Sequence, residues 1–210
     1  MAHPNVDDFE EVLLKRPLDA VVREYIFEPE PYAFRDWPRG CEILRAHLCR
    51  SLRLSEQNVI VIGSAKVGFS LSPDNFGRRF SDDSDIDVLV VDDALFDTVW
   101  KTLLQWNYPR RYHLSGADWK WARSRMGDLY WGWFRPDRIR YDGLSFPHVL
   151  KPLRDISVRW FNAFRSLSRY PQFARREFSG RLYRTWDHAL LYQIDGLRQI
   201  SEAIRARREG

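Results

Sequence analysis

The stretch 58–92, NVIVIGSAKVGFSLSPDNFGRRFSDDSDIDVLVVD, decides how the rest of the chain is arranged. Its apolar runs predict strands over 59–62 and 86–91, joined by a Gly-Ser turn and an irregular polar loop. Asp85 and Asp87 stand at the entrance of the second strand. Because side chains alternate along a strand, both carboxylates lie on one face, roughly 6–7 Å apart. Two anions this close favour a bound cation, and Mg²⁺ shared by carboxylates and substrate phosphates is a common solution.

The turn at Gly63-Ser64 supplies the complementary half of such a site. Glycine after a strand lets the backbone approach a ligand closely, and amides at the start of a following helix attract phosphate. Ser64 adds a hydroxyl, and Lys66 is a cation just past the turn. We therefore assign phosphate binding to Gly63, Ser64 and Lys66, and metal binding to Asp85 and Asp87.

Gly-Ser after a strand, followed by Asp-x-Asp opening the next strand, resembles the signature of the polymerase-beta-like nucleotidyltransferase superfamily, over about residues 40–106. In that superfamily the Gly-Ser holds the triphosphate of a nucleotide and the two aspartates bind the catalytic metals. Gly63 and Asp85 are 22 positions apart, which is similar to relatives that make second-messenger oligonucleotides. The resemblance implies Mg²⁺ (or Mn²⁺) as cofactor, a nucleoside triphosphate as substrate, and RNA, a nucleotide or a protein as acceptor. It also implies a bacterial stand-alone enzyme of a toxin–antitoxin or antiphage module.

The resemblance further implies a third carboxylate on a later strand. Asp118 has the setting of a helix cap, and Asp137 that of a turn after Pro136. Asp128 precedes the aromatic run 129–134, which could be a strand, and Asp142 follows a segment that alternates apolar and basic residues. We take Asp142 or Asp128 as the tentative third acid, and the choice between them stays open.

Charge is divided unevenly along the chain. Residues 1–107 hold 12 Lys and Arg against 19 Asp and Glu, a net −7, and residues 108–210 carry a net +11. The division predicts an acidic metal-binding half facing a basic half across one cleft, or else an arginine-rich solvated surface. Arg135, Arg138 and Arg140 are the candidates for the basic wall, whereas we expect Arg78 and Arg79 to pair with the acidic turn 82–83.

The remaining pattern predicts an α+β fold: a nucleotidyltransferase-like mixed sheet backed by helices, with a C-terminal helical extension. Helices are expected over 6–28 with a break at 16–17, and over 41–52, 94–106, 156–167 and 187–208. Short strands are expected near 129–134 and 180–183, the first of them placing Trp131 and Trp133 in the core. We divide the chain into a catalytic core, 1–145, and a helical region packed on it, 146–210.

Cys41 and Cys49 are eight positions apart in one expected helix, too far apart to form a disulfide. No run of 18 apolar residues indicates a membrane span, and the acidic N-terminus lacks the apolar segment of a signal peptide. We therefore expect reduced thiols, a cytoplasmic setting and no membrane partner.

The leading hypothesis is an Mg²⁺-dependent nucleotidyltransferase that transfers a nucleoside monophosphate to a hydroxyl acceptor. The alternative is a catalytically inactive member of the same fold that binds nucleotide or RNA as a regulatory or assembly subunit. A third hypothesis is a partner subunit whose aromatic C-terminal half binds another protein.

Overall fold

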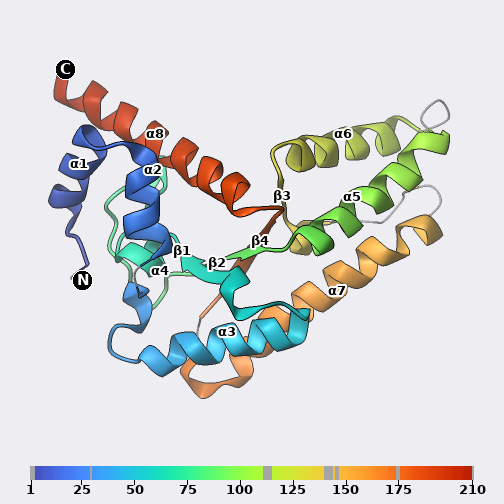
Figure 1. The fold of residues 1–210 in the computed structure, drawn as a ribbon, viewed down its shortest axis with the longest axis horizontal. Helices are drawn as coiled ribbons and strands as arrows, with labels where there is room; N and C mark the ends of the chain where they lie inside the picture. Colours follow the sequence, from blue (N-terminus) through green and yellow to red (C-terminus); the bar gives the residue numbers. More distant parts are fainter. Residues whose placement is uncertain are drawn as a thin grey trace.

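A four-stranded mixed sheet lies at the centre of the molecule, in the computed structural model that describes residues 3–28, 30–110, 115–139, 144, 147–173 and 176–209 (Figure 1). The strands are β1 (Val59–Ile62), β2 (Ile86–Val91), β3 (Trp133–Phe134) and β4 (Phe178–Tyr183), in the order β1-β2-β4-β3. β2 pairs with β1 in antiparallel fashion and with β4 in parallel, and β3 pairs antiparallel with β4.

Eight α-helices surround the sheet: α1 (Val6–Lys15), α2 (Leu18–Val21), α3 (Pro38–Leu52), α4 (Ser64–Val67), α5 (Asp93–Asn107), α6 (Gly116–Tyr130), α7 (Lys151–Arg165) and α8 (Trp186–Glu209), counted over the described ranges. A π-helical turn, η1 (Val22–Phe27), follows α2. The connections contain short 3₁₀ turns: η2 (Tyr32–Phe34), η3 (Glu56–Asn58), η4 (Pro73–Asn75), η5 (Tyr108–Arg110), η6 (Pro136–Arg138), η7 (Pro147–Leu150), η8 (Ser166–Arg169) and η9 (Pro171–Phe173).

The two faces of the sheet have different covers (Figure 1). On one face Val61, Val88 and Leu182 are buried in the main core with side chains of α3, α5 and α7. On the other face Leu89 and Tyr183 pack in a smaller cluster with Ala189 of α8. The N-terminal helices pack on the outer part of α8 through a third apolar cluster. Asp85 and Asp87 share the α8 face of β2, because the intervening Ile86 belongs to the main core.

These elements confirm the predicted α+β class, with a mixed sheet backed by helices and a helix at its C-terminal end. Both strands predicted in the 58–92 stretch have the predicted bounds, and the strand predicted at 180–183 starts two residues earlier, at Phe178. The region 146–210 contributes β4 to the interior of the sheet as well as helices α7 and α8.

Two local predictions were wrong. The run 129–134 is not one strand, because α6 continues to Tyr130 and only Trp133 and Phe134 pair with β4. Trp131 ends the helix and is 67 % exposed rather than buried. The helix expected at 94–106 is capped one residue earlier than expected, because the Asp92 carboxylate accepts the amide of Leu95 at 2.6 Å.

Both cysteines are free and buried, and burial raises the pKa of each thiol. Across the described helices, none combines the length and apolarity that crossing a membrane requires.

Candidate functional site

The turn after β1 brings the backbone against a β2 carboxylate. Gly63 adopts φ +66° and ψ −148°, a conformation that L residues with a side chain rarely adopt. A Cβ at this position would lie 3.2 Å from Asp87 Oδ2. The glycine therefore lets the start of α4, with Ser64 as its first residue, lie beside Asp87.

Asp87 is fixed between two neighbouring strands. It stands opposite Ile62 of β1 and Ser179 of β4 in the strand registers. Ser179 Oγ donates a hydrogen bond to Asp87 Oδ1 at 2.6 Å. This bond leaves lone pairs on both Asp87 oxygens for a further ligand and holds the carboxylate in one orientation.

Asp85 lies in a concentration of negative charge. Partial burial raises the pKa of Asp85, and the charges of Glu177 and Asp87 raise it further, whereas Arg78 lowers it. Glu177 directly precedes β4, and by strand alternation it shares the Ser179 face. The ionised form of Asp85 is therefore disfavoured by burial and by neighbouring negative charge, which a bound cation would relieve.

Asp85 and Asp87 line one cavity of about 540 Å³, which we call the carboxylate cavity, whereas Glu177 is not among its lining residues. It brings together four of the predicted site residues, Gly63, Ser64, Asp85 and Asp87, with Arg135 of the predicted basic wall. The rest of its lining comes from the 70–84 loop, β4 and α8: Ser70, Leu71, Ser72, Arg78, Arg79, Ser81, Asp83, Ser84, Ser179, Gly180, Arg181, Tyr183, Tyr192 and Gln193, with Ile62 and Val88 of the sheet.

Arg78 and Arg79 do not pair with the acidic turn 82–83 as predicted. Both line the carboxylate cavity, and neither is within ion-pair distance of a carboxylate in the part of the chain that the structure describes. A backbone bond from Ser70 N–H to the Arg78 carbonyl, 2.8 Å long, and a β-bridge from Phe69 to Arg79 hold this part of the loop.

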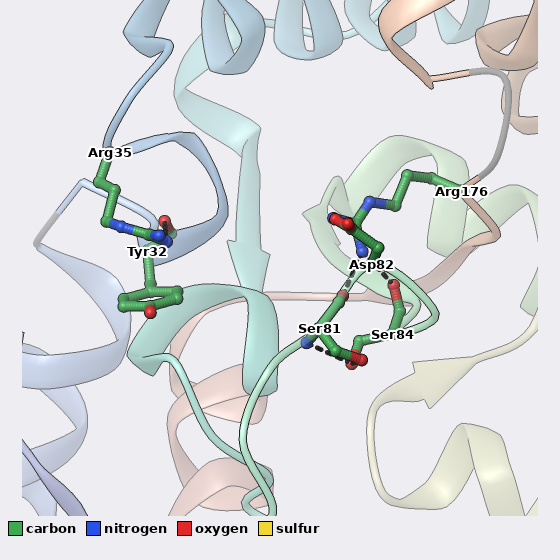
Figure 2. A network of polar contacts seen from close by, with 6 residues as sticks. All are labelled: Tyr32, Arg35, Ser81, Asp82, Ser84 and Arg176. Carbon is green, nitrogen blue, oxygen red and sulfur yellow. Dashed lines mark hydrogen bonds and ion pairs between the residues drawn. The ribbon is translucent and has the colours of Figure 1, made fainter.

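The cation that holds the acidic turn is Arg176, just before β4 (Figure 2). Its Nη2 lies 2.8 Å from Asp82 Oδ1, and its Nη1 donates to the carbonyls of Ser81 and Ser84. The guanidinium also lies 5.0 Å from the centre of the Phe80 ring. Arg176 thus takes the place beside Asp82 that we expected Arg78 or Arg79 to take, while Asp83 lines the carboxylate cavity together with these two arginines.

Two more arginines complete the basic side of the cavity. The Arg181 guanidinium lies between two aromatic rings, 4.6 Å from the centre of Trp133 and 4.2 Å from that of Tyr192. Arg135 forms a two-pronged pair with Asp137, at 3.1 Å and 2.5 Å. Of the other predicted wall residues, Arg138 does not line the cavity, and Arg140 lies outside the described residues.

Lys66 is not placed to meet a phosphate in the carboxylate cavity. It is 1 % exposed and does not line the cavity. Two helical steps turn a side chain through about 200°, so Lys66 lies on the opposite side of α4 from Ser64. Burial and the charge of Arg45 lower the pKa of Lys66 to about 8, while Cys41 and Glu30 act in the opposite direction.

Asp128, one of the two tentative third acids, does not line the carboxylate cavity. Asp128 is in α6 instead of preceding a strand, and its carboxylate is 3.1 Å from Arg125 Nη1. Asp142 lies outside the described residues. Asp118 is the N3 residue of a capping box with Ser115, as its setting suggested, and Asp137 pairs with Arg135.

Sequence reasoning missed the contribution of β4 to the site. Glu177, Ser179 and Arg181 alternate with the apolar residues Phe178 and Leu182, which is the pattern of a strand with one polar face. This pattern was available in the sequence, but only the pairing of β4 with β2 places these residues beside Asp85 and Asp87.

Among the described residues, no group of three or more His, Cys, Asp or Glu side chains is arranged to hold a metal ion by itself. Mg²⁺ in enzymes that act on phosphates is commonly held by one or two carboxylates together with substrate oxygens. The Asp85–Asp87 pair therefore suits a metal that enters with a phosphorylated ligand.

The chain was compared with protein-family models, with curated proteins and with solved structures, and none of the three comparisons gave a match.

Proposed function

We propose that the protein is a magnesium-dependent nucleotidyltransferase. The proposal rests on one observation: the Gly63–Ser64 turn and the Asp85–Asp87 pair line the same cavity, with the Cβ position of Gly63 only 3.2 Å from Asp87 Oδ2. Because residue 63 has no side chain, the turn and the carboxylate can lie side by side and face one cavity, in which we place a phosphate and its metal.

In the proposed reaction, an acceptor hydroxyl attacks the α-phosphorus of a nucleoside triphosphate. A new oxygen–phosphorus bond forms, the bond from the α-phosphorus to the bridging oxygen breaks, and pyrophosphate leaves. Gly63 N–H and Ser64 Oγ bind the β- and γ-phosphates, and Arg78 and Arg79 neutralise their charge. Asp85 and Asp87 would hold Mg²⁺, which when bound polarises the α-phosphate.

Glu177 is our candidate for the group that takes the proton of the acceptor hydroxyl. Its charge acts on Asp85, and it directly precedes β4, the strand that pairs with β2, while the resemblance implies a third acid on a later strand. We propose Glu177 for this role in place of Asp128. Ser179 then serves as a positioning residue that orients Asp87.

The alternative proposal is a catalytically inactive protein that binds nucleotide or RNA. The lining of the carboxylate cavity favours it, because the described lining has no third acid on a later strand. Its acids are Asp83, Asp85 and Asp87, and Asp83 lies in the 70–84 loop. Under either proposal we expect a cytoplasmic setting and a role in a toxin–antitoxin or antiphage module.

The experiment that separates them is incubation with each of the four α-³²P-labelled triphosphates and Mg²⁺, with RNA, protein or free nucleotide as acceptor. We expect Mg²⁺-dependent transfer of label that Asp85→Asn and Asp87→Asn each abolish and that Asp74→Asn, in exposed turn η4, leaves unchanged. Triphosphate binding without transfer to any acceptor would favour the inactive alternative. Full activity of the Asp85→Asn/Asp87→Asn protein would overturn the metal-site assignment.

A further inference from the structure

A second, larger hollow runs along the outer side of α7. It has a volume of about 1090 Å³ and is lined by four arginines, Arg154, Arg159, Arg165 and Arg169, together with Ser51 of α3 and the polar side chains of Asn162, Ser166 and Ser168. We call it the arginine groove. Its one lining carboxylate, Asp155, pairs with Lys151 at 2.6 Å. None of the four arginines has an ion-pair partner within the described ranges.

The composition of this surface differs from that of an ordinary solvated helix face. Val158 lines the groove and is 52 % exposed. Phe161 is equally exposed and lies at the border of the groove, in the lining of the adjoining cavity described below, and the Arg165 guanidinium lies 5.9 Å from the centre of its ring. Unpaired arginines beside an exposed aromatic ring are the combination that binds the phosphates and stacks the bases of a single strand.

A third cavity, of about 490 Å³, connects the arginine groove with the carboxylate cavity. We call it the edge cavity. It shares Arg165 and Ser168 with the arginine groove, and Ser179 and Gly180 with the carboxylate cavity. The three hollows are therefore neighbours, and we call their succession from the outer side of α7 to Asp87 the path.

The path exists because β3 is short. β3 pairs only with Leu182 and Tyr183, so the preceding residues of β4 have no strand beside them on that edge. Trp160 of α7 lines the edge cavity at this point, and its indole Nε1 is buried without a hydrogen-bond partner in the described chain. This donor lacks an acceptor, which an ordered water or a ligand atom would supply.

We propose that the arginine groove binds single-stranded RNA and that the edge cavity leads its end to the carboxylate cavity. This inference rests on the proposed function and names the acceptor: the transferred nucleotide is joined to a hydroxyl at the RNA terminus. The strand entering is single, because a cavity of about 490 Å³ cannot admit a duplex. The Ser166 and Ser168 hydroxyls donate to the Ala163 and Arg165 carbonyls, which leaves their oxygens as acceptors. The Asn162 amide adds both a donor and an acceptor for 2′-hydroxyl groups, by which a protein distinguishes RNA from DNA.

Fluorescence anisotropy with a 5′-fluorescein-labelled 12-nucleotide single-stranded RNA tests the groove. Arg154→Gln/Arg165→Gln removes two exposed groove charges, and Arg23→Gln/Arg205→Gln removes two exposed charges from η1 and α8 as the matched control. We expect the groove variant to bind about tenfold more weakly and its plot of log K against log salt to be flatter by about 1.4, since each single-strand phosphate contact contributes about 0.7. Equal effects of the two variants, or no binding of RNA by the wild-type protein, would overturn the proposal.

Crosslinking tests the path. RNA with 4-thiouridine as its last 3′ nucleotide should crosslink within 176–183, and RNA with an internal 4-thiouridine should crosslink within 151–169. A 3′ crosslink confined to other parts of the chain would overturn the proposal. The matching DNA oligonucleotide should bind more weakly, and equal or tighter binding of DNA would contradict the choice of RNA.

The test of RNA binding can be separated from the test of the proposed nucleotidyltransferase activity. Binding of a fluorescent triphosphate in the presence of Mg²⁺ should be unchanged in Arg154→Gln/Arg165→Gln, and Asp85→Asn/Asp87→Asn should still bind RNA. RNA binding without any nucleotide transfer would retain the groove and overturn its role as an acceptor site. Transfer to a nucleotide or protein acceptor, but not to RNA, would retain the proposed function and overturn this inference.

Discussion

Ser179 and Asp87 are joined by a 2.6 Å hydrogen bond across the parallel pair β4–β2. The bond orients a carboxylate whose other oxygen faces the Gly63 turn. A residue of β4 therefore sets the geometry of a site that β1 and β2 build. This relationship makes Ser179 a positioning residue whose effect on transfer can be measured.

Ser179→Ala should lower nucleotide transfer by about tenfold or more and leave the fold intact. A hydrogen bond to a charged group contributes about 1.5–3 kcal/mol, and here its loss frees Asp87 to leave its orientation. The measurement is transfer rate against Mg²⁺ concentration: the variant should need more Mg²⁺ for half-maximal rate, and Ser179→Thr should restore much of the loss. A Mg²⁺ dependence identical to that of the wild type would contradict the positioning role.

Gly63→Ala should weaken triphosphate binding and lower the free energy of unfolding. The left-handed backbone costs a residue with a side chain roughly 1–2 kcal/mol, and the new methyl group would approach Asp87 Oδ2 at 3.2 Å. Ser64→Ala should weaken binding without the loss of stability. Titration with a fluorescent triphosphate and urea unfolding of both variants measure the two effects. Wild-type affinity in a folded Gly63→Ala protein would remove the turn from the site.

Arg78→Gln/Arg79→Gln should weaken triphosphate binding and reduce its dependence on salt. Both arginines line the carboxylate cavity, and neither has a carboxylate within ion-pair distance across the described residues. Arg138→Gln is the control, since Arg138 does not line the cavity. Isothermal titration at two salt concentrations should show a smaller difference between them for the double variant than for the control. Indistinguishable salt dependences would leave these two arginines with only a surface role.

The stability of the Asp85→Asn protein should depend on pH in a defined direction. Burial, Glu177 and Asp87 raise the pKa of Asp85 in the folded state. A carboxyl group whose pKa is raised in the folded state stabilises the folded protein at pH values below its ordinary pKa. This stabilisation is lost as the pH rises through the folded-state pKa. The variant should therefore gain stability relative to the wild type on going from pH 4 to pH 7, as measured by urea unfolding. A gain of the same size at both pH values would show that Asp85 is not held among uncompensated charges.

Lys66→Met should remove a rise in stability between pH 8 and pH 10.5. Burial and the charge of Arg45 lower the pKa of Lys66 to about 8. The contribution of neutral Lys66 to the free energy of unfolding is therefore fully present above the ordinary lysine pKa, and it is lost as the pH falls through about 8. The difference in pKa corresponds to ~3 kcal/mol. Cys41 has a raised pKa and gives the opposite slope in both proteins. Parallel stability curves for the wild-type and Lys66→Met proteins over this pH range would contradict the prediction.

The local pattern around Gly63, Asp85 and Asp87 was enough to predict two strands, the turn between them and the common face of the carboxylates. These features depend on alternation and on backbone freedom, which short stretches of sequence determine. The position of Lys66 was not predictable in this way, because it depends on which side of a four-residue helix is buried.

The partners of charged groups depended on tertiary structure. Arg176, which is 94 residues from Asp82, holds the acidic turn, whereas the sequence neighbours Arg78 and Arg79 were expected to do so. The third acid was sought before residue 146, since nothing local indicates that β4 lies next to β2. Asp128 is in a helix because the capping box at Ser115 starts α6 before the aromatic run.

The parallel pairing of β2 with β4 also fixes the order in which the site can form during synthesis. Ser179 leaves the ribosome 92 residues after Asp87, and β4 must be inserted between β2 and β3 before the sheet is complete. A nascent chain that has not reached β4 carries the Gly-Ser turn and both aspartates but lacks Ser179, Arg181 and the α8 wall of the cavity. The carboxylate cavity can thus form only after β4 and the first part of α8 have been synthesised, by which time helices α1–α7 have already been made.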